Sequence, residues 1–263
     1  MNRARKRFGQ HFLHDLQVIT RIVAAIDPRP GEHLVEIGPG RGALTAHLVE
    51  RVGKLDAVEI DRDLARELAA RFGDALTIEA RDVLDVDFAR LQGGGPRLRV
   101  VGNLPYNIST PLLFHLLGQR AAIADMHFML QKEVVDRMVA PPGSKVYGRL
   151  TVMLAPWVRI ERLFMVGPGA FSPQPKVASA FVRLVPLEHA AFDIGSAPHF
   201  ERVVRAAFSQ RRKTLRNSLR GVLDPAIFER LGIDAGDRPE QLAPAQFGEL
   251  ARACRVDSPP TPL

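Results

Sequence analysis

The sequence of 263 residues predicts a doubly wound α/β protein with a small all-helical domain after it. Two observations predict this fold. Short apolar runs alternate with helical patterns from about residue 34 to residue 139, which is typical of a mostly parallel sheet with helices on its faces. After about residue 186 the apolar residues recur at helical spacing. We therefore expect a sheet domain at residues 1–187 and a helical domain at residues 188–263.

The first half of the chain supplies the alternation. Apolar residues recur at helical spacing over residues 16–26, and the Asp-Pro-Arg-Pro-Gly run at residues 27–31 ends that helix. Residues 34–37 form a short apolar strand, and a glycine-rich turn separates this strand from the next helix. The further elements of this half are strands at residues 55–61, 76–80 and 98–101 and a helix over residues 63–71.

The second half changes character along its length. Its first elements are a helix at residues 111–117, a strand at residues 125–130 and a helix at residues 132–139. Residues 150–164 and 177–186 fit a helix or a strand followed by two late strands around a Gly/Pro-rich turn. From Phe200 to Leu219 an amphipathic helical stretch carries arginines on its other face, and short helices follow.

Composition sets the broad class. A hydrophobic fraction of 46% and a charged fraction of 25% are ordinary for a soluble globular protein. No apolar run approaches the roughly 18–20 residues of a membrane helix, and no apolar stretch with a cleavage site follows the basic N-terminus. The single cysteine, Cys254, excludes an internal disulfide and a cysteine-rich zinc site. We expect a cytoplasmic monomer without a metal and without a membrane partner.

The net charge of +7 favours an anionic partner. The basic residues crowd the first seven positions and return in the helical region, where the densest group is Arg211, Arg212, Lys213 and Arg216. These four side chains either contact nucleic-acid phosphates or form an ordinary solvated helix face.

Residues 38–42, with the sequence Gly-Pro-Gly-Arg-Gly, lie between the first sheet strand and a helix. Glycines let a backbone approach a ligand closely, but a simple tight turn explains them equally well. Glu59 ends the next strand 21 positions after Gly38, where an acidic side chain bridges ribose hydroxyls in nucleoside-binding folds. NAD enzymes share this geometry. A dinucleotide site, however, favours G-x-G-x-x-G, and position 43 here is Ala43.

Asp82 ends the third strand and offers an acceptor for an adenine amino group. Three successive strand ends, with Gly38, Glu59 and Asp82, then line one crevice. Together they favour S-adenosylmethionine as the cofactor.

The strand at residues 98–101 runs into Asn103-Leu104-Pro105-Tyr106. Asn103 offers an amide oxygen as acceptor, Pro105 stiffens the turn and removes a donor, and Tyr106 supplies a flat face for stacking. This composition suits the binding of an exocyclic amine on an aromatic ring. A strand-to-helix turn capped by asparagine is the structural alternative.

Five motifs together resemble the ribosomal RNA adenine dimethyltransferases, and within them the bacterial small-subunit type. They are RKRFGQHFL at residues 5–13, VEIGPG at 35–40, GNLPYNIS at 102–109, MLQKEV at 129–134 and FSPQPKV at 171–177. The similarity covers residues 5 to about 220. It implies a Rossmann-like methyltransferase fold with a seven-stranded, mostly parallel sheet.

The resemblance also implies site residues. The family's contacts to S-adenosylmethionine fall on His11, Leu13, Gly38, Glu59, Asp82 and Asn103. The family varies between Asn and His at position 11, so His11 could act through its backbone atoms. The adenine site falls on Asn103, Leu104, Pro105 and Tyr106, with Phe171 stacking on the opposite side of the base from Tyr106. Arg211, Arg212, Lys213 and Arg216 would contact RNA phosphates.

The implied activity is dimethylation of N6 of two adjacent adenosines in the 3′-terminal hairpin loop of 16S ribosomal RNA, within the 30S subunit. This activity would place the protein in small-subunit biogenesis. Two alternatives remain. An antibiotic-resistance methyltransferase of large-subunit RNA would share the glycine turn and the Asn-x-Pro-Tyr stretch, although residues 143–150 favour the small-subunit type. A non-catalytic assembly factor would not need Glu59, Asp82, Asn103 and Tyr106.

Overall fold

The computed structural model describes residues 11–210 and 212–254. The chain divides into two compact units, which are treated separately below. The sheet unit comprises Met1–Val135 and Arg159–Pro186, and the helical unit comprises Asp136–Val158 and Leu187–Leu263. None of the described helices is both long and apolar enough to cross a membrane.

The sheet unit is built on a mixed sheet in which the described residues form seven strands, in the order β4-β3-β2-β5-β6-β9-β7. Strands β4, β3, β2, β5 and β6 pair in parallel, and β9 pairs antiparallel to β6. The seven-stranded, mostly parallel sheet predicted from the sequence is therefore confirmed. The bounds of the strands are β2 Leu34–Ile37, β3 Leu55–Val58, β4 Leu76–Glu79, β5 Leu98–Asn103, β6 Ile123–Gln131, β7 Val158–Val166 and β9 Ser179–Pro186.

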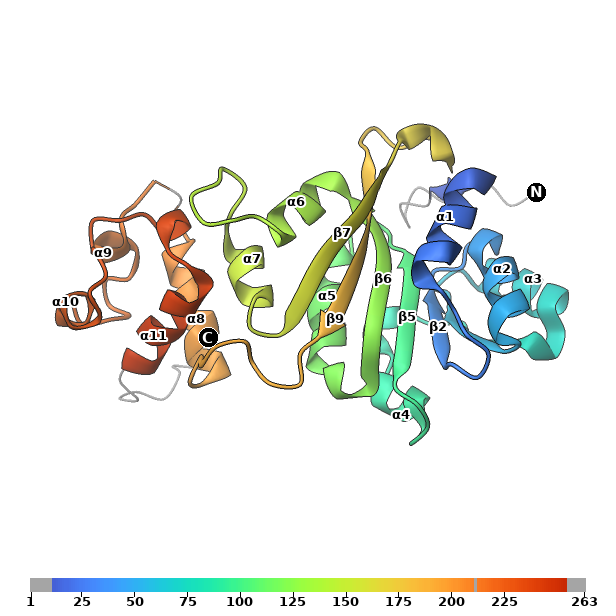
Figure 1. The fold of residues 1–263 in the computed structure, drawn as a ribbon, viewed down its shortest axis with the longest axis horizontal. Coiled ribbons are helices and arrows are strands. Elements are labelled where there is room, and N and C mark those ends of the chain that lie inside the picture. The colour runs from blue at the N-terminus through green and yellow to red at the C-terminus, as the bar shows by residue number, and fades with distance from the viewer. Residues whose placement is uncertain (1–10, 211, 255–263) are drawn as a thin grey trace. The chain divides into compact units, whose positions relative to one another are not determined.

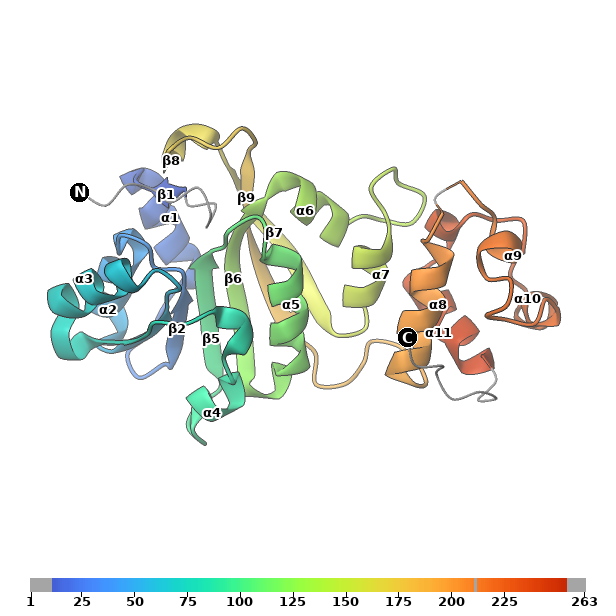
Figure 2. The same cartoon turned by 180° about the vertical axis from the view of Figure 1, so that it is seen from behind.

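Helices cover both faces of this sheet. Helix α1 lies on one face, and α5 lies on the opposite face beside β5 and β6 (Figures 1 and 2). The helices of the unit are α1 Leu16–Ile26, α2 Ala43–Val52, α3 Arg62–Phe72, α4 Phe88–Gln92, α5 Ser109–Gly118 and α6 Lys132–Met138, which continues into the helical unit.

Helix α1 shows how local sequence sets these elements. The Asp15 side chain accepts hydrogen bonds from the backbone N–H groups of Gln17 and Val18, which caps the helix start. Asp27 ends the helix in a left-handed conformation with φ of 48°, directly before Pro28. The apolar stripe that includes Ile22 and Ile26 is buried.

A short two-stranded sheet was not predicted. Strand β1 (Phe12–Leu13) pairs antiparallel with β8 (Phe171–Ser172), so that Leu13 lies opposite Phe171. Each strand has two residues, too few for a period of two to be visible in the sequence. This pairing fixes the N-terminal segment beside the end of the sheet domain.

The helical unit has its own apolar core. Phe200, Phe247 and Leu250 are almost fully buried in it, and the Tyr147 hydroxyl donates to the Leu242 carbonyl at 2.8 Å. Its helices are α7 Arg149–Leu154, α8 Ala197–Ala207, α9 Leu215–Ser218, α10 Ala226–Leu231 and α11 Pro244–Ala253.

Two features of the helical unit differ from expectation. Residues 136–158 belong to it, because Val152 of α7 packs in its core, whereas the sequence suggested a boundary at 187/188. The stretch from Phe200 to Leu219 is also not continuous. Helix α8 ends at Ala207, and the Leu215 N–H at the start of α9 donates to the Asp237 carbonyl at 2.8 Å.

The contact of β5 with β2 depends on Gly102. A Cβ atom there would lie 2.5 Å from the backbone oxygen of Ile37, its partner across the parallel pair. We predict that Gly102→Ala lowers the free energy of unfolding by about 1–3 kcal/mol, as overpacking does in other cores. Urea denaturation measures it. The matched control is Gly118→Ala in α5, where nothing lies within 4 Å of the added Cβ. Equal stability of the two variants would contradict the prediction.

Candidate active site

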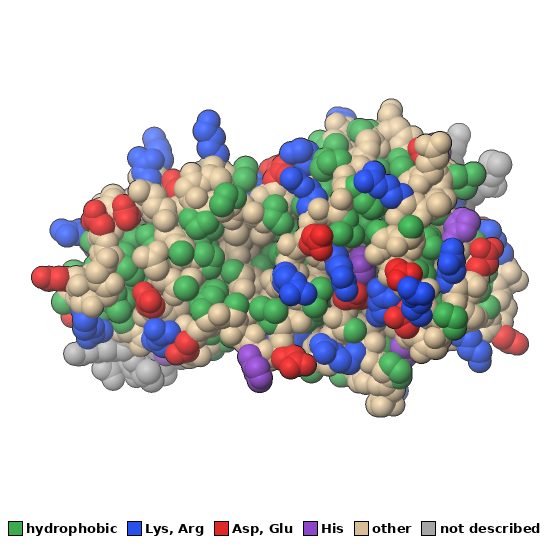
Figure 3. All heavy atoms as spheres, viewed as in Figure 1, with side chains coloured by type: hydrophobic (Ala, Val, Ile, Leu, Met, Phe, Trp, Pro, Cys, Tyr) green, Lys and Arg blue, Asp and Glu red, His purple; other side chains and the backbone are tan. Residues whose placement is uncertain are grey.

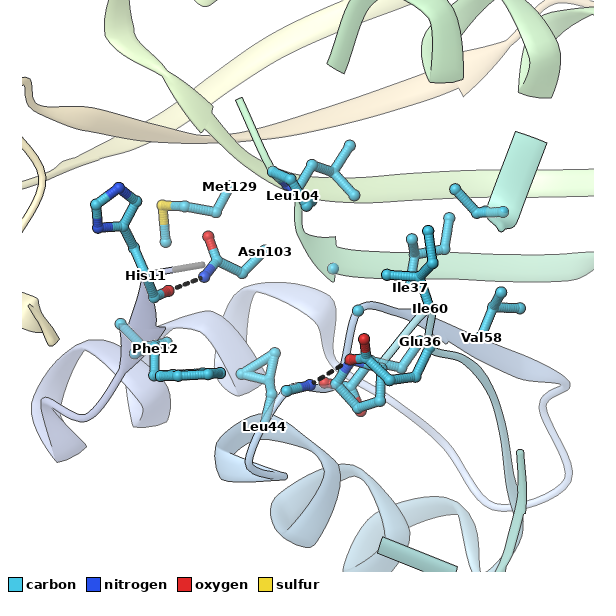
Figure 4. Close-up of a pocket in the computed structure, with 18 of the residues that line it drawn as sticks. His11, Phe12, Glu36, Ile37, Leu44, Val58, Ile60, Asn103, Leu104 and Met129 are labelled. Atoms are coloured by element: carbon cyan, nitrogen blue, oxygen red, sulfur yellow. Dashed lines mark hydrogen bonds between the residues drawn. The ribbon is translucent and has the colours of Figure 1, made fainter. Parts of the chain in front are cut away.

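A cavity of about 350 Å³ opens at the carboxyl ends of the parallel strands, where open α/β sheets bind their ligands. Figure 4 shows part of its lining, with His11 and Asn103 on one side and Glu36 and Ile60 on another. The residues expected from the sequence that line it are His11, Leu13, Gly38, Glu59, Asp82, Asn103, Leu104, Pro105 and Tyr106.

The glycine turn between β2 and α2 forms the floor of this cavity. Gly40 has a φ of 59°, a conformation that side chains other than glycine rarely adopt. A Cβ at Gly40 would also lie 3.1 Å from the Phe12 ring, which packs directly on the turn. The guanidinium of Arg41 lies 4.6 Å from the centre of the same ring. Close approach of β1 to the turn therefore requires glycine at this position.

Glu59 follows strand β3 and is buried. Its carboxylate accepts hydrogen bonds from the Gly40 N–H at 3.1 Å and the Asp61 N–H at 2.9 Å. Burial raises the pKa of this carboxyl group, and the backbone hydrogen bonds oppose that shift. With one lone pair of each oxygen engaged by the backbone, the carboxylate is held rigidly and can still accept from two ribose hydroxyls.

Glu36 is a site residue that the sequence analysis missed. It lies inside strand β2, is 3% exposed, lines the cavity and accepts a hydrogen bond from the Thr45 hydroxyl at 2.6 Å. Burial raises the pKa of Glu36 from 4.5 to about 7; the Thr45 bond lowers it and the charge of nearby Glu59 raises it further. An acidic residue in the otherwise apolar run Leu34–Ile37 was the available signal.

The polar and apolar groups around the cavity indicate which cofactor it can bind. Glu59 lies at the end of the second strand of the site, where its carboxylate can accept from the ribose hydroxyls of a nucleoside cofactor, and Glu36 adds a buried carboxyl group beside the glycine turn. Asp82 adds an acceptor at the end of the third strand, and its carboxylate is held by the Leu84 N–H at 3.0 Å. Ile60 and Val83 add apolar walls beside these groups. These acceptors and apolar walls fit S-adenosylmethionine, a nucleoside with two ribose hydroxyls, an adenine amino group and a sulfonium cation. Among the described residues no group of three or more His, Cys, Asp or Glu side chains could hold a metal.

Asn103 ends strand β5, and its side chain has a defined orientation. Its amide nitrogen donates to the backbone carbonyl of His11 at 2.9 Å (Figure 4). This contact uses the –NH₂ group, so the amide oxygen is turned away from His11 and is available as an acceptor. Leu104 follows with its N–H bound to the Met129 carbonyl at 3.2 Å, which fixes the backbone after β5.

Two contacts fix the Tyr106 side chain, one at its hydroxyl and one at its ring. Its hydroxyl lies 3.1 Å from the Ser179 hydroxyl, and its ring stacks on the His11 imidazole with 5.5 Å between centroids and 29° between planes. Burial raises the pKa of the Tyr106 phenol, so the group stays neutral at physiological pH.

The Phe171 side chain, which was expected to stack on the target base, is buried in this structure. Its side chain is 3% exposed and belongs to an apolar core cluster with Val166, Ala170 and Phe181, while its backbone pairs with Leu13. It does not line the cavity. The pairing of β8 with β1 directs this ring into the core, and the ring that faces Tyr106 is that of His11.

The candidate RNA-binding residues lie in the helical unit. Arg212 and Lys213 are exposed just before α9, Arg216 is exposed within it, and Arg211 lies outside the described residues. On the face drawn in Figure 3, Lys and Arg side chains are interspersed with Asp and Glu and do not form one continuous patch.

A glycine turn, acidic strand ends and an Asn-Leu-Pro-Tyr stretch around one cavity define an S-adenosylmethionine-dependent methyltransferase. The chain belongs to the ribosomal RNA adenine dimethylase family, whose family model matches residues 1–254.

Proteins of known name support this assignment. The ribosomal RNA small subunit methyltransferase A of Xylella fastidiosa is 56% identical over 253 residues, which cover 95% of this chain and 96% of that protein. The protein of the same name from Xanthomonas euvesicatoria is 58% identical over 251 residues, 94% of this chain and 95% of that one.

Solved structures share the fold. A dimethyladenosine transferase from Plasmodium falciparum has a TM-score of 0.77 at 24% identity, covering 91% of this chain and 96% of its own. The 23S rRNA methyltransferase ErmE has a TM-score of 0.71 at 26% identity, covering 92% of this chain and 99% of its own.

The buried Glu36 makes stability depend on pH. Its pKa is raised in the folded state, so the folded protein holds this proton more tightly than the unfolded chain does. The contribution of Glu36 to the free energy of unfolding is therefore fully present below pH 4.5 and is lost as the pH rises through about 7. One pKa unit corresponds to about 1.4 kcal/mol, so the loss reaches at most about 3 kcal/mol.

We predict that Glu36→Gln removes this dependence. The amide oxygen of Gln can still accept from Thr45, and the side chain never ionises. In urea denaturation the variant should gain stability over the wild type between pH 5 and pH 8. A stability difference that stays constant over this range would contradict the charge account.

Proposed function

We propose that this protein transfers methyl groups from S-adenosylmethionine to N6 of two adjacent adenosines in the 3′-terminal hairpin loop of 16S ribosomal RNA. Each adenosine receives two methyl groups, and the substrate is the 30S subunit. The observation that carries the proposal is the orientation of Asn103, whose amide oxygen is free to accept because its nitrogen is bound to His11. The name of the relatives, at 56–58% identity over nearly the whole chain, supports the choice of small-subunit RNA.

The chemistry explains why an acceptor is needed. The lone pair of adenine N6 is delocalised into the ring, which makes N6 a poor nucleophile. If the Asn103 amide oxygen and the Leu104 carbonyl accept its two N–H bonds, N6 becomes more tetrahedral, and its lone pair is less conjugated with the ring and can point at the methyl group. Bound S-adenosylmethionine supplies an electrophilic methyl group on sulfur. Catalysis then consists of alignment and electrostatics, without a covalent enzyme intermediate.

The remaining residues of the stretch position the base. Pro105 limits the backbone of the turn, and the Tyr106 ring offers a face on which an unstacked adenine lies. A neutral phenol suits this role, because the ring then stacks without bringing a charge into the site. No general base is needed before transfer, since the N6 proton becomes acidic once the nitrogen is methylated.

The substrate loop suits such a site. A-form helices hide the edges of their bases, whereas loop bases can be splayed out and stacked on aromatic side chains. We propose that Arg212, Lys213 and Arg216, together with Arg211, contact the RNA backbone from the helical unit. The protein would act as a monomer in the cytoplasm, where 30S subunits are assembled.

A large-subunit RNA methyltransferase is the alternative, since ErmE shares the fold. In this chain residues 143–150 belong to the helical unit, where Tyr147 is buried and bound to the Leu242 carbonyl. The two functions differ in substrate, so the product decides between them.

The direct test is to incubate the protein with labelled S-adenosylmethionine and 30S subunits that lack the modification. We predict N6,N6-dimethyladenosine at both loop adenosines, mapped by mass spectrometry of nuclease fragments. Unmethylated 50S subunits are the control and should remain unlabelled. Label in 50S alone, or in neither subunit, would refute the proposal.

Asn103→Ala separates catalysis from binding in the same assay. Without the acceptor oxygen, the rate constant for transfer should fall at least about a hundredfold, as for removal of one preorganised hydrogen-bonding group elsewhere. Binding to 30S subunits, measured by sedimentation, should be retained.

The phosphate contacts predict a change in salt dependence. Each contact contributes about 0.9 to the slope of log affinity against log salt concentration for duplex nucleic acid and about 0.7 for single strands. Replacing Arg212, Lys213 and Arg216 by alanine should therefore weaken 30S binding and flatten this slope. Arg230→Ala, which removes an exposed arginine from α10 of the same unit, is the control. An unchanged slope in the triple variant would show that these side chains do not contact phosphates.

A further inference from the structure

Within the described part of the chain His11 makes one backbone contact and two side-chain contacts that bear on the adenine site. Its carbonyl accepts from the Asn103 amide at 2.9 Å. Its imidazole stacks on the Tyr106 ring at 5.5 Å between centroids, and its Nδ1 lies 2.7 Å from the Pro173 carbonyl oxygen. A carbonyl can only accept, so Nδ1 carries the proton of this hydrogen bond.

We propose that the His11 imidazole is a placeholder for the target adenine, which covers the stacking face of Tyr106 until the base enters and displaces it. The proposal rests on the function proposed above and concerns how that site admits its substrate. His11 is in this view a specificity-determining residue of the adenine site.

The spacing of the two rings requires displacement. A centroid distance of 5.5 Å falls in the usual range for paired aromatic rings and leaves no layer free between them. A base inserted between two parallel rings needs them about 7 Å apart, twice the contact distance of about 3.5 Å between carbon atoms. Adenine and the imidazole therefore cannot share this face of Tyr106 at the observed spacing.

The hydrogen bonds show which ring moves. The Tyr106 hydroxyl is bound to Ser179, on the central part of the sheet unit next to β6, so this ring is anchored at its far end. Among the described residues, the imidazole is held by the Pro173 carbonyl and by the stacking contact. Rotation of the His11 side chain breaks that bond but leaves its backbone carbonyl on Asn103. The placeholder can thus leave without disturbing the orientation of the acceptor.

The exchange favours a large base. When a base enters, the protein loses the imidazole–tyrosine stacking and the hydrogen bond to Pro173. In return the base stacks on Tyr106, and this contact grows with the ring area of the base. A purine offers two fused rings, whereas a pyrimidine offers one. His11 would therefore act against pyrimidines and against bases that are only partly unstacked.

The test measures binding of a hairpin with 2-aminopurine at a target position and needs no methyl transfer. Stacking quenches the fluorescence of 2-aminopurine, so its intensity reports the stacking state of the target base. We predict that His11→Ala binds this RNA about two- to tenfold more tightly than the wild type, since no ring has to be displaced. His11→Phe retains a ring on Tyr106 and should bind like the wild type or more weakly. In a Tyr106→Leu background the effect of His11→Ala should vanish. Weaker or unchanged binding by His11→Ala would overturn the placeholder role. Weaker binding is the result expected if the imidazole itself stacks on the bound base, because the variant then loses that contact.

A second measurement needs no RNA. The ring protons of His11, assigned with His11→Ala, should show an upfield shift in the NMR spectrum of the free protein that Tyr106→Leu abolishes. Adding the hairpin should also remove it. Absence of the shift in the free protein, or its persistence in the complex, would refute the proposal. Failure of the wild type to methylate 30S subunits would instead refute the proposed function, and the NMR test of the free protein is independent of that result.

Discussion

The hydrogen bond from the Asn103 amide nitrogen to the His11 carbonyl is the constraint on which the site depends. A carboxamide presents a donor on one side and an acceptor on the other, and an adenine amine can use only the acceptor. The carbonyl that sets the orientation of this amide belongs to His11, which lies 92 residues earlier in the sequence. The pairing of β1 with β8 holds the segment after His11, and the Leu104 N–H bond to Met129 holds the backbone after Asn103. In the proposed mechanism, methyl transfer therefore relies on a segment outside the central sheet.

Charge in the cavity complements this geometry. Glu36 and Glu59 are both buried near the glycine turn, where dinucleotide-binding folds place a pyrophosphate. Here the Gly40 N–H of the turn donates a hydrogen bond to the Glu59 carboxylate, so this backbone donor is already satisfied within the protein. Two buried carboxyl groups thus lie beside the turn in this chain. The raised pKa of Glu36 is the cost of keeping one of them in an apolar strand.

Much of the site could be predicted because parallel strands bring their carboxyl ends together. Gly38, Glu59, Asp82 and Asn103 each follow a strand that its apolar run revealed. Phe171 could not be placed this way, since its orientation depends on pairing with Leu13 across the chain. Residues 136–158 joined the helical unit through packing of Val152, which local periodicity does not reveal. Glu36 was overlooked because one acidic residue does not disturb an apolar run.

A crystal structure of the protein with the demethylated product of its cofactor and an RNA hairpin carrying the target adenosines tests the role of the Asn103 hydrogen bond most directly. We predict that N6 of an unstacked adenine lies about 3 Å from both the Asn103 amide oxygen and the Leu104 carbonyl oxygen. The Asn103 amide nitrogen should remain on the His11 carbonyl. An adenine bound elsewhere, or one whose N6 contacts neither oxygen, would contradict the role assigned to this hydrogen bond.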